Sequence, residues 1–309
     1  MKRRDLLKSG ASLGCLSAFP LGAKSWMATG LDDNTTSSPS PLKPPADGSI
    51  PVAFVISDGA VIIDFCGPWE VFQDVSLPAR GMDHMHDAFS LYTVAETTNP
   101  IRASAGMKIV PNYTFANAPV PKVIVIPAQR NATNAALDWI RKISSTADVT
   151  MSVCTGAFVL AEAGLLKGKS ATTHHSAYKS LGLEFPDVHV RRGARFVEEG
   201  SLATAGGLSS GIDLALRVVE RYYGRYAAEQ TAYQMEYQGE GWKNPNSNQA
   251  YAARRVSTDE HPLCPVCDMD IADKASSPSS IYKGKTYYFC SGDHKGLFDQ
   301  SPEKYLNAD

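Results

Sequence analysis

Short apolar runs alternate with helical spacing through the middle of the chain. Four runs predict buried strands, at residues 52–56, 89–94, 122–127 and 149–153, and the stretch 135–143 has the spacing of a helix. Strand–helix alternation predicts a parallel sheet covered on both faces, with sites at the carboxyl ends of its strands. We therefore expect an α/β domain over residues 49–239.

The amino-terminal segment departs from this pattern. Residues 1–28 open with a basic head that contains Arg3 and Arg4, followed by an apolar stretch too short to span a bilayer. The arginine pair followed by Leu6 resembles a twin-arginine signal and predicts a periplasmic or exported protein; a basic tail is the alternative. Residues 29–48 are rich in serine and proline and predict a disordered linker.

The carboxyl-terminal segment departs as well. Residues 240–258 are polar, with proline and asparagine, and predict a second linker. Residues 259–309 show a hairpin pattern turning at Gly284 and then a short helix. A unit of this size buries too small a core to fold without a metal ion or another cross-link.

Composition narrows the possible functions. A length of 309 residues predicts roughly two domains. The chain has 30 Lys and Arg residues and 32 Asp and Glu residues, so no excess of basic residues points to nucleic acid as the partner. Six cysteines are too few for a disulfide scaffold, yet three of them lie in the last 46 residues, from Cys264 onward.

Those three cysteines have the spacing of a metal site. Cys264 and Cys267 are separated by two residues, and Cys290 precedes His294 by one helical turn. Three thiolates and one imidazole suit tetrahedral Zn²⁺ or Cu(I). A redox pair or a disulfide is the alternative, and Asp293 is a further possible ligand.

Cys154 lies at the junction of a predicted strand and a predicted helix. Unpaired backbone N–H groups and the positive end of a helix dipole favour a thiolate there and lower its pKa. Gly156 would let the turn pack closely. The alternative is a small, buried, apolar cysteine.

Four collinear segments resemble the ThiJ/PfpI superfamily, and most closely the branch shared by isonitrile hydratase and the amino-terminal halves of AraC-type regulators. The segments are residues 64–72, 153–166, 171–175 and 204–220. The resemblance implies a flavodoxin-like sandwich of the class I glutamine amidotransferase type, commonly a homodimer. It also implies a small-molecule electrophile or ligand as the partner.

The resemblance implies a set of site residues too. Cys154 would be the nucleophile, Asp64 the acid facing its sulfur, Thr155 the neighbour that completes the set, and His174 a histidine close to the cysteine. A protonated Asp64 would donate a hydrogen bond to the sulfur and then supply a proton to the substrate. The alternatives are that Asp64 and Thr155 cap turns and that His174 is an exposed strand-end residue.

One departure from that family weakens the catalytic interpretation. The chain has Pro127, Ala128 and Gln129 where the family often has Pro-Gly-Gly. Those glycines help to form an oxyanion hole, and an alanine reaches positive φ less readily.

Residues 264–269, 282–291 and 298–306 resemble the YHS domain, which is related to the TRASH metal-binding modules. This second resemblance implies metal binding. Family members usually carry a third cysteine where His294 stands, and many have Asp at the position of Cys264. His294 keeps the number of ligands at four but supplies a nitrogen instead of a sulfur, which makes the ligand set less soft.

Two hypotheses follow for the whole chain. In the first, the protein is an enzyme that hydrates isonitriles to N-substituted formamides or acts on glyoxal-like carbonyls. In the second, it is a non-catalytic protein that binds or senses a small ligand or a heavy metal. No helix-turn-helix pattern follows the α/β domain, so neither hypothesis includes direct nucleic-acid binding.

Overall fold

A seven-stranded sheet forms the centre of the molecule in the computed structural model, which describes residues 40–77, 88–129 and 132–306. The strand order is β10-β11-β7-β6-β1-β2-β5; all neighbours run parallel except β10, which is antiparallel to β11. The strands are β1 (Ile50–Val55), β2 (Phe89–Ala95), β5 (Tyr113–Thr114), β6 (Val123–Ile126), β7 (Val149–Val153), β10 (Phe196–Glu199) and β11 (Leu202–Ala205).

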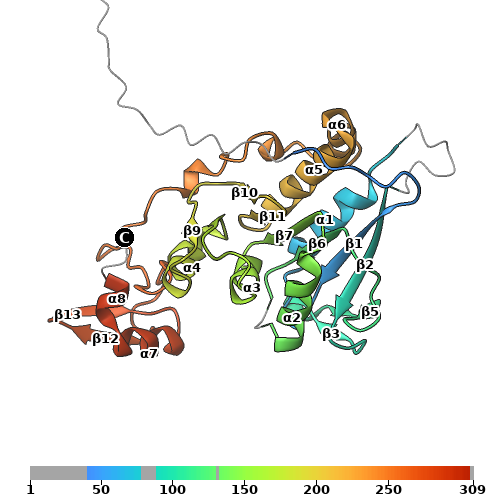
Figure 1. The fold of residues 1–309 in the computed structure, drawn as a ribbon. Helices are drawn as coiled ribbons and strands as arrows, with labels where there is room; N and C mark the ends of the chain where they lie inside the picture. Colours follow the sequence, from blue (N-terminus) through green and yellow to red (C-terminus); the bar gives the residue numbers. More distant parts are fainter. Residues whose placement is uncertain (1–39, 78–87, 130–131, 307–309) are drawn as a thin grey trace, which may run out of the picture. The chain divides into compact units, whose positions relative to one another are not determined.

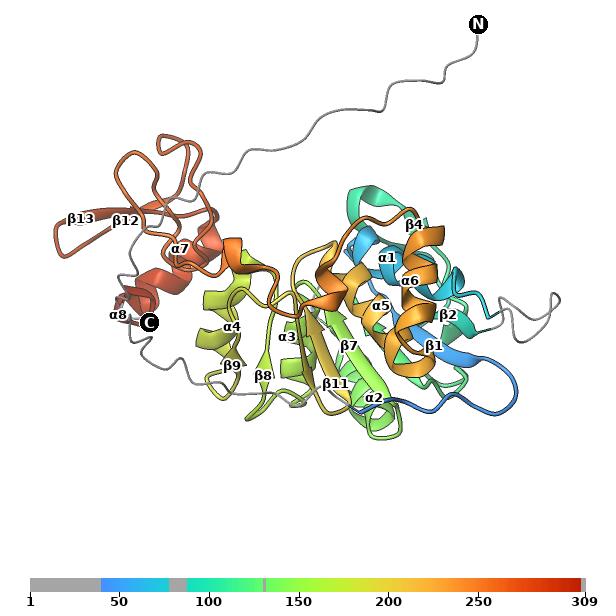
Figure 2. The same ribbon diagram turned by 90° about the horizontal axis from the view of Figure 1, so that it is seen from above.

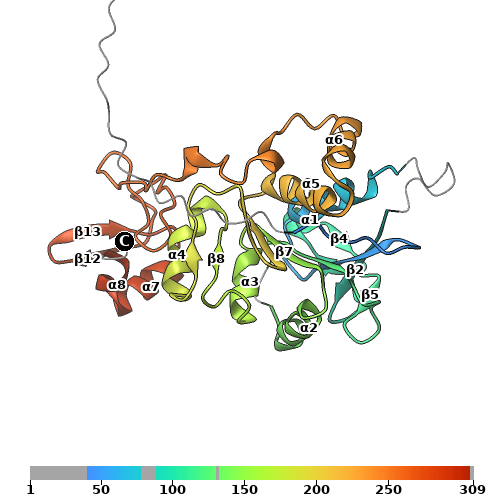
Figure 3. The same cartoon turned by 45° about the horizontal axis from the view of Figure 1, so that its top comes forward.

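Helices cover both faces of the sheet (Figure 1). One face packs against α1 (Ile62–Gln73), α5 (Ser210–Tyr223) and α6 (Arg225–Gln234). The other packs against α2 (Asn134–Ser144) and α3 (Gly156–Glu162), while α4 (Tyr178–Glu184) contacts the short strand β9 (His189–Val190). Figure 3 shows the two layers with the sheet between them. The predicted α/β sandwich is confirmed.

Local sequence explains these elements. All four residues of β6 are buried, as expected for a strand covered on both faces. The side chain of Thr133 caps α2 by accepting a hydrogen bond from the Ala136 N–H. Shorter elements complete the domain: β3 (Ile101–Arg102), β4 (Lys108–Ile109), β8 (Ser170–Ala171), β9 (His189–Val190), and the 3₁₀ turns η2 (Ser104–Gly106) and η3 (His175–Ala177).

Parts of both segments predicted as linkers pack onto this domain. The predicted signal, residues 1–28, and the first part of the first linker lie outside the described residues. Farther on, the Leu42 N–H donates to the Arg221 carbonyl at 2.7 Å. In the second segment, η4 (Gly241–Lys243) and η5 (Gln249–Tyr251) form, and Trp242 is only 2% exposed. The first part of this segment therefore belongs to the α/β domain.

The carboxyl-terminal module is small. Its hairpin joins β12 (Ser279–Tyr282) to β13 (Lys285–Tyr288), and Gly284 adopts φ +76° at the turn. The helices α7 (Gly292–Gln300) and α8 (Pro302–Leu306) follow, as Figure 2 shows in red. The predicted hairpin and helix are thus both present. Among the described residues, no helix has the length and apolar character needed to cross a membrane.

Candidate functional site

Cys154 sits in a tight turn between β7 and α3. Its backbone adopts φ +58°, a left-handed conformation that costs about 1–3 kcal/mol in a non-glycine residue. The Cys154 N–H donates to the Gly206 carbonyl at 2.9 Å, and its carbonyl accepts from the Thr173 hydroxyl at 2.9 Å. A Cβ on Gly156 would lie 2.3 Å from the Ile126 carbonyl oxygen, so the close packing predicted there requires glycine.

Burial raises the pKa of the Cys154 thiol to about 11, and the charge of Asp64 adds to the rise. The N–H groups of Thr155 and Leu208 and the Thr155 hydroxyl hydrogen-bond to the sulfur and oppose this effect. The predicted lowering of the Cys154 pKa is therefore wrong for the free protein. The helix that follows is only seven residues long, and desolvation outweighs its N-terminal N–H groups.

Leu208 is a site residue that the sequence prediction missed. It adopts φ +43° directly after Gly206 and Gly207, and its N–H points at the Cys154 sulfur. The backbone N–H groups of Thr155 and Leu208, which belong to different loops, thus both face the Cys154 sulfur. The signal in the sequence is the glycine pair, Gly206 and Gly207, which permits the tight turn that brings the Leu208 N–H toward the sulfur.

Asp64 is fully buried inside α1. Its Oδ2 accepts a hydrogen bond from the Ala128 N–H at 3.1 Å, whereas its Oδ1 has no partner among the described residues. Burial raises the pKa of Asp64 to about 6, against the opposing hydrogen bonds from Ala128 and Cys154. The N-cap of α1 is Val61, so Asp64 does not cap this helix.

The loop after β6 uses its backbone to hold Asp64. The Ala128 N–H is bonded to the carboxylate, and the Ala128 carbonyl accepts from the Val61 N–H at 2.8 Å. Gln129 accepts from the Ser57 hydroxyl through Oε1 at 3.0 Å. Neither Ala128 nor Gln129 has positive φ. The Ala128 N–H is therefore committed to Asp64, and the donors that face the sulfur come from Thr155 and Leu208.

His174 lies against the same Gly206–Leu208 loop. A Cβ on Gly207 would come within 2.3 Å of the His174 Cδ2 atom. The Nδ1 atom accepts from the Ser176 N–H at 3.3 Å, so the neutral ring carries its proton on Nε2. Burial, with a smaller effect from His175, lowers the pKa of His174. Within the described structure, no hydrogen bond joins His174 to Cys154, so their predicted proton exchange stays a prediction.

The predicted metal ligands of the carboxyl-terminal module converge. The ligand atoms of Cys264, Cys267, Cys290 and His294 all lie within 4.8 Å of one another. Cys267 Sγ is 3.6 Å from Cys290 Sγ, and His294 Nδ1 is 3.6 Å from Cys264 Sγ and 3.1 Å from Cys290 Sγ. Tetrahedral Zn²⁺ places two sulfurs about 3.8 Å apart and sulfur and nitrogen about 3.6 Å apart. The four side chains thus fit such an ion.

Local hydrogen bonds hold this cluster in place. The Ser291 hydroxyl caps α7 by accepting from the His294 N–H at 3.2 Å, which fixes the imidazole one turn after Cys290. A hydrogen bond from the Cys267 thiol lowers the pKa of Cys264, which favours the thiolate form that binds a metal. The cysteines are free, and Asp293 lies in the first turn of α7 outside the ligand group.

The mostly parallel sandwich, with a cysteine in a strained turn beside a buried carboxyl group, defines a flavodoxin-like α/β protein with a candidate cysteine site. The chain belongs to the DJ-1/PfpI family, whose model matches residues 51–221. Its carboxyl-terminal part is a YHS domain, matched over residues 264–309.

Two curated relatives illustrate the range of this family. Isonitrile hydratase from Pseudomonas putida is 32% identical over 194 residues, covering 61% of this chain and 79% of that protein. The HTH-type transcriptional regulator CdhR from Pseudomonas aeruginosa is 30% identical over 164 residues, covering 51% of this chain and 48% of the regulator. The chain thus spans about half of the regulator's length.

Solved structures show the same fold. A ThiJ/PfpI family protein from Pseudomonas syringae superposes with a TM-score of 0.54 at 23% identity, covering 75% of this chain and 98% of that chain. An AraC family transcriptional regulator from Pseudomonas putida gives a TM-score of 0.52 at 18% identity, covering 60% and 99%. At these identities the likeness establishes the fold alone.

Proposed function

We propose that the α/β domain hydrates a small electrophilic carbon, with an isonitrile as the first substrate to test and a glyoxal-like carbonyl as the second. The observation that carries this proposal is the unpartnered Oδ1 of Asp64, which is fully buried beside Cys154. A buried carboxyl group with a pKa near 6 and a free oxygen is suited to move a proton. The similarity to isonitrile hydratase supports the choice of substrate.

In this proposal Cys154 is the nucleophile of an elbow between β7 and α3. The sulfur attacks the isonitrile carbon while its proton passes to the Asp64 carboxylate, and Asp64 returns the proton to that carbon, giving a thioimidate. Water then adds to the C=N bond and the Cys154 thiol leaves. One isonitrile and one water become one N-substituted formamide, with no oxidant or reductant. The N–H groups of Thr155 and Leu208 stabilise negative charge on the sulfur in both steps.

Hydration of an alkyl isonitrile provides the test. We expect the purified chain to produce the formamide, detected by proton NMR, and Cys154→Ser to reduce the rate to that of the buffer. Cys66→Ser is the matched control, because Cys66 is a half-buried cysteine of α1 outside the proposed reaction, and it should retain the rate. Formation of formamide at an equal rate by Cys154→Ser would refute the nucleophile.

A second candidate is a binding or sensing role for the same site. Two observations favour it: the raised pKa of Cys154, and the commitment of the Ala128 N–H to Asp64 instead of to a substrate. The similarity to a transcriptional regulator points the same way. If no formamide or carbonyl product forms while a small ligand protects Cys154 from alkylation, this candidate replaces the first.

For the YHS domain we propose that Cys264, Cys267, Cys290 and His294 hold Zn²⁺ or Cu(I). Such an ion would supply cross-linking of the small module when bound. The residues themselves contribute three sulfur ligands and one nitrogen ligand, of which Cys264 and Cys267 are buried. Three sulfurs favour a soft ion, and His294 makes Zn²⁺ more competitive than a fourth sulfur would.

We also propose that residues 1–28 direct export by the twin-arginine route, and that the exported protein is a homodimer that does not act on nucleic acid. We expect cell fractionation to place the wild-type chain in the periplasm and an Arg3→Lys, Arg4→Lys double variant in the cytoplasm. Equal distribution of the two proteins would contradict export by this route. Light scattering of the exported form should give twice the mass of the mature chain.

A further inference from the structure

The loop of residues 206–209 carries one of the two backbone N–H groups that face the Cys154 sulfur. Leu208 supplies this N–H group and adopts φ +43°, a left-handed conformation that persists only where surrounding groups hold it. The two residues before it are glycines, which restrict the backbone least. The position of the Leu208 N–H group therefore depends on contacts made from outside the loop.

Arg195, directly before β10, binds this loop at both of its ends. Its carbonyl oxygen accepts the Gly206 N–H at 2.9 Å. Its Nη2 atom donates to the Ser209 hydroxyl at 3.0 Å. Ser209 is the N-cap of α5, yet its side chain makes no capping hydrogen bond, so its hydroxyl is left to accept from Arg195. One residue thus brackets the backbone that carries Leu208.

The segment after α6 and the first turns of α5 fix Arg195 in turn. Its Nε atom donates to Asp213 Oδ2 at 2.5 Å, and its Nη1 atom donates to Asn248 Oδ1 at 3.2 Å. The Asp213 side chain is 1% exposed, so solvent screens this ion pair little. Asp213 Oδ1 accepts the Trp242 N–H at 2.9 Å, and the Pro245 carbonyl accepts the Arg195 N–H at 2.6 Å. The segment after α6 therefore holds the backbone, the guanidinium group and the carboxylate partner of Arg195.

We propose that Arg195 is a positioning residue, which holds the loop so that the Leu208 N–H points at the Cys154 sulfur, and that residues 242–248 complete this arrangement. Arg195 acts on the sulfur through Leu208. The inference rests on the proposed site at Cys154 but not on turnover there. It extends that site into a segment that lies beyond residues 51–221, the part that matches the DJ-1/PfpI family model.

The pH dependence of Cys154 alkylation tests this role. The full-length chain is treated with iodoacetamide from about pH 7 to about pH 10, and labelling of the Cys154 peptide is followed by mass spectrometry. The Leu208 N–H lowers the pKa of the thiol, so its displacement leaves less thiolate at a given pH. Asp64, whose charge also acts on the sulfur, stays in place in every variant.

We expect Arg195→Lys to slow labelling at about pH 9 by about tenfold, the effect of weakening one hydrogen bond to a charged group, and to move the profile to higher pH. Lysine keeps the positive charge but lacks the planar fork that serves Asp213, Asn248 and Ser209 together. Ser209→Ala and Asn248→Ala each remove one of these contacts and should move the profile in the same direction by less. If Arg195→Lys does not fold, the profile of Ser209→Ala decides.

Two variants of α5 serve as matched controls. Ser210→Ala changes the residue next to Ser209, a buried serine whose hydroxyl has no partner among the described residues, and should leave the profile unchanged. Arg217→Lys weakens another largely buried ion pair of the same helix. It should lower the melting temperature without moving the profile, which separates lost stability from lost positioning.

Three results would overturn the proposal. If Arg195→Lys behaves as Arg217→Lys does, its role is structural only. Faster labelling of Arg195→Lys would show that the loop shields Cys154 instead of stabilising its thiolate. A shift in Ser210→Ala equal to that in Ser209→Ala would remove the assignment to the Arg195 contact.

The outcome is separate from that of hydration, because labelling requires no turnover. A chain that forms no formamide but shows the shift in Arg195→Lys keeps the positioning role and loses the proposed enzyme. A chain that hydrates isonitriles while the profile of Arg195→Lys equals that of the wild type keeps the enzyme and loses the positioning role.

Discussion

Replacing Cys290 with serine is expected to abolish stoichiometric metal binding and to unfold the YHS domain. Cys290 ends the hairpin and begins the turn into α7, where its sulfur lies 3.1 Å from His294 and 3.6 Å from Cys267. The affinity should fall by more than the roughly 10–100-fold that loss of an outer hydrogen-bonding partner costs. Metal content by mass spectrometry and thermal unfolding under reducing conditions measure both effects.

The α/β domain should keep its own unfolding transition in this variant, because its two core clusters do not include the residues of the module's core. Cys66→Ser again provides the control and should bind metal as the wild type does. A metal-free protein whose YHS domain is as stable as the loaded form would contradict the proposed role of the ion. So would a disulfide between two of the module's cysteines in protein isolated from the periplasm.

Asp64→Asn is expected to stabilise the α/β domain at pH 8 while reducing hydration by about 10²–10⁴-fold, the usual contribution of a general acid or base. The folded-state pKa of Asp64 is about 6, above the ordinary value of 3.8. The folded state therefore holds this proton more tightly, and stability falls as pH rises from about 4 through 6. At pH 8, ionisation of the buried Asp64 lowers the free energy of unfolding of the wild type by about 3 kcal/mol, at about 1.4 kcal/mol per unit of pKa shift.

Asparagine keeps a carbonyl oxygen for the Ala128 N–H and removes the buried charge. Its gain in melting temperature over the wild type should thus be present at pH 8 and absent at pH 4. The same variant should move the midpoint of Cys154 alkylation to lower pH, because the Asp64 charge contributes to the raised pKa of the thiol. A variant destabilised equally at both pH values would show that Asp64 has a packing role only.

The fold was predictable from the sequence wherever the pattern of hydrophobic and polar positions follows burial directly. The apolar run of β6 and the amphipathic spacing of α2 depend on local neighbours and on the faces they cover, and both lie within one or two residues of the prediction. The metal ligands were predictable for a similar reason. Cys264 and Cys267 are close in sequence, as are Cys290 and His294, and the hairpin brings the pairs together.

The rest of the candidate site depended on distances that sequence does not contain. The pKa of Cys154 reflects its depth and its separation from Asp64, which is 90 positions earlier in the chain. The role of Leu208 requires a backbone conformation that a leucine rarely adopts. Trp242 was hidden in a polar segment, because one buried aromatic residue among charged and amide neighbours leaves no periodic pattern.

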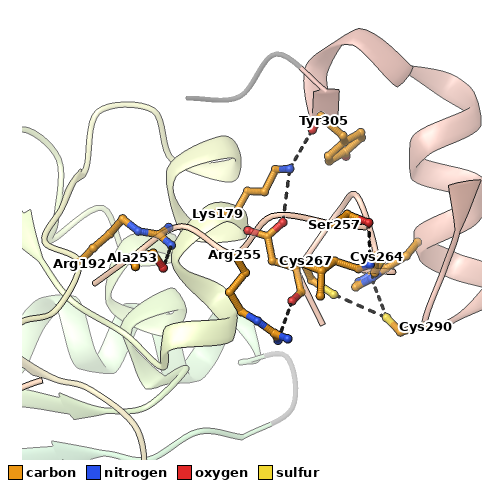
Figure 4. A network of polar contacts seen from close by, with 12 residues as sticks. Lys179, Arg192, Ala253, Arg255, Ser257, Cys264, Cys267, Cys290 and Tyr305 are labelled. Carbon is orange, nitrogen blue, oxygen red and sulfur yellow. Dashed lines mark hydrogen bonds and ion pairs between the residues drawn. The ribbon is translucent and has the colours of Figure 1, made fainter. Parts of the chain in front are cut away.

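The burial of Trp242 also determines how far the YHS domain can move. Because η4 and η5 are held on the α/β domain, and Arg192 donates to the Ala252 carbonyl at 3.1 Å, the tether shortens to about residues 253–258. Six residues span at most about 20 Å when fully extended. A module on so short a tether stays at a millimolar effective concentration near the α/β domain. The contacts that hold it there include the Lys179–Asp268 ion pair (Figure 4) and the packing of Leu183 against the module's core. Whenever they break, they re-form intramolecularly, independent of protein concentration.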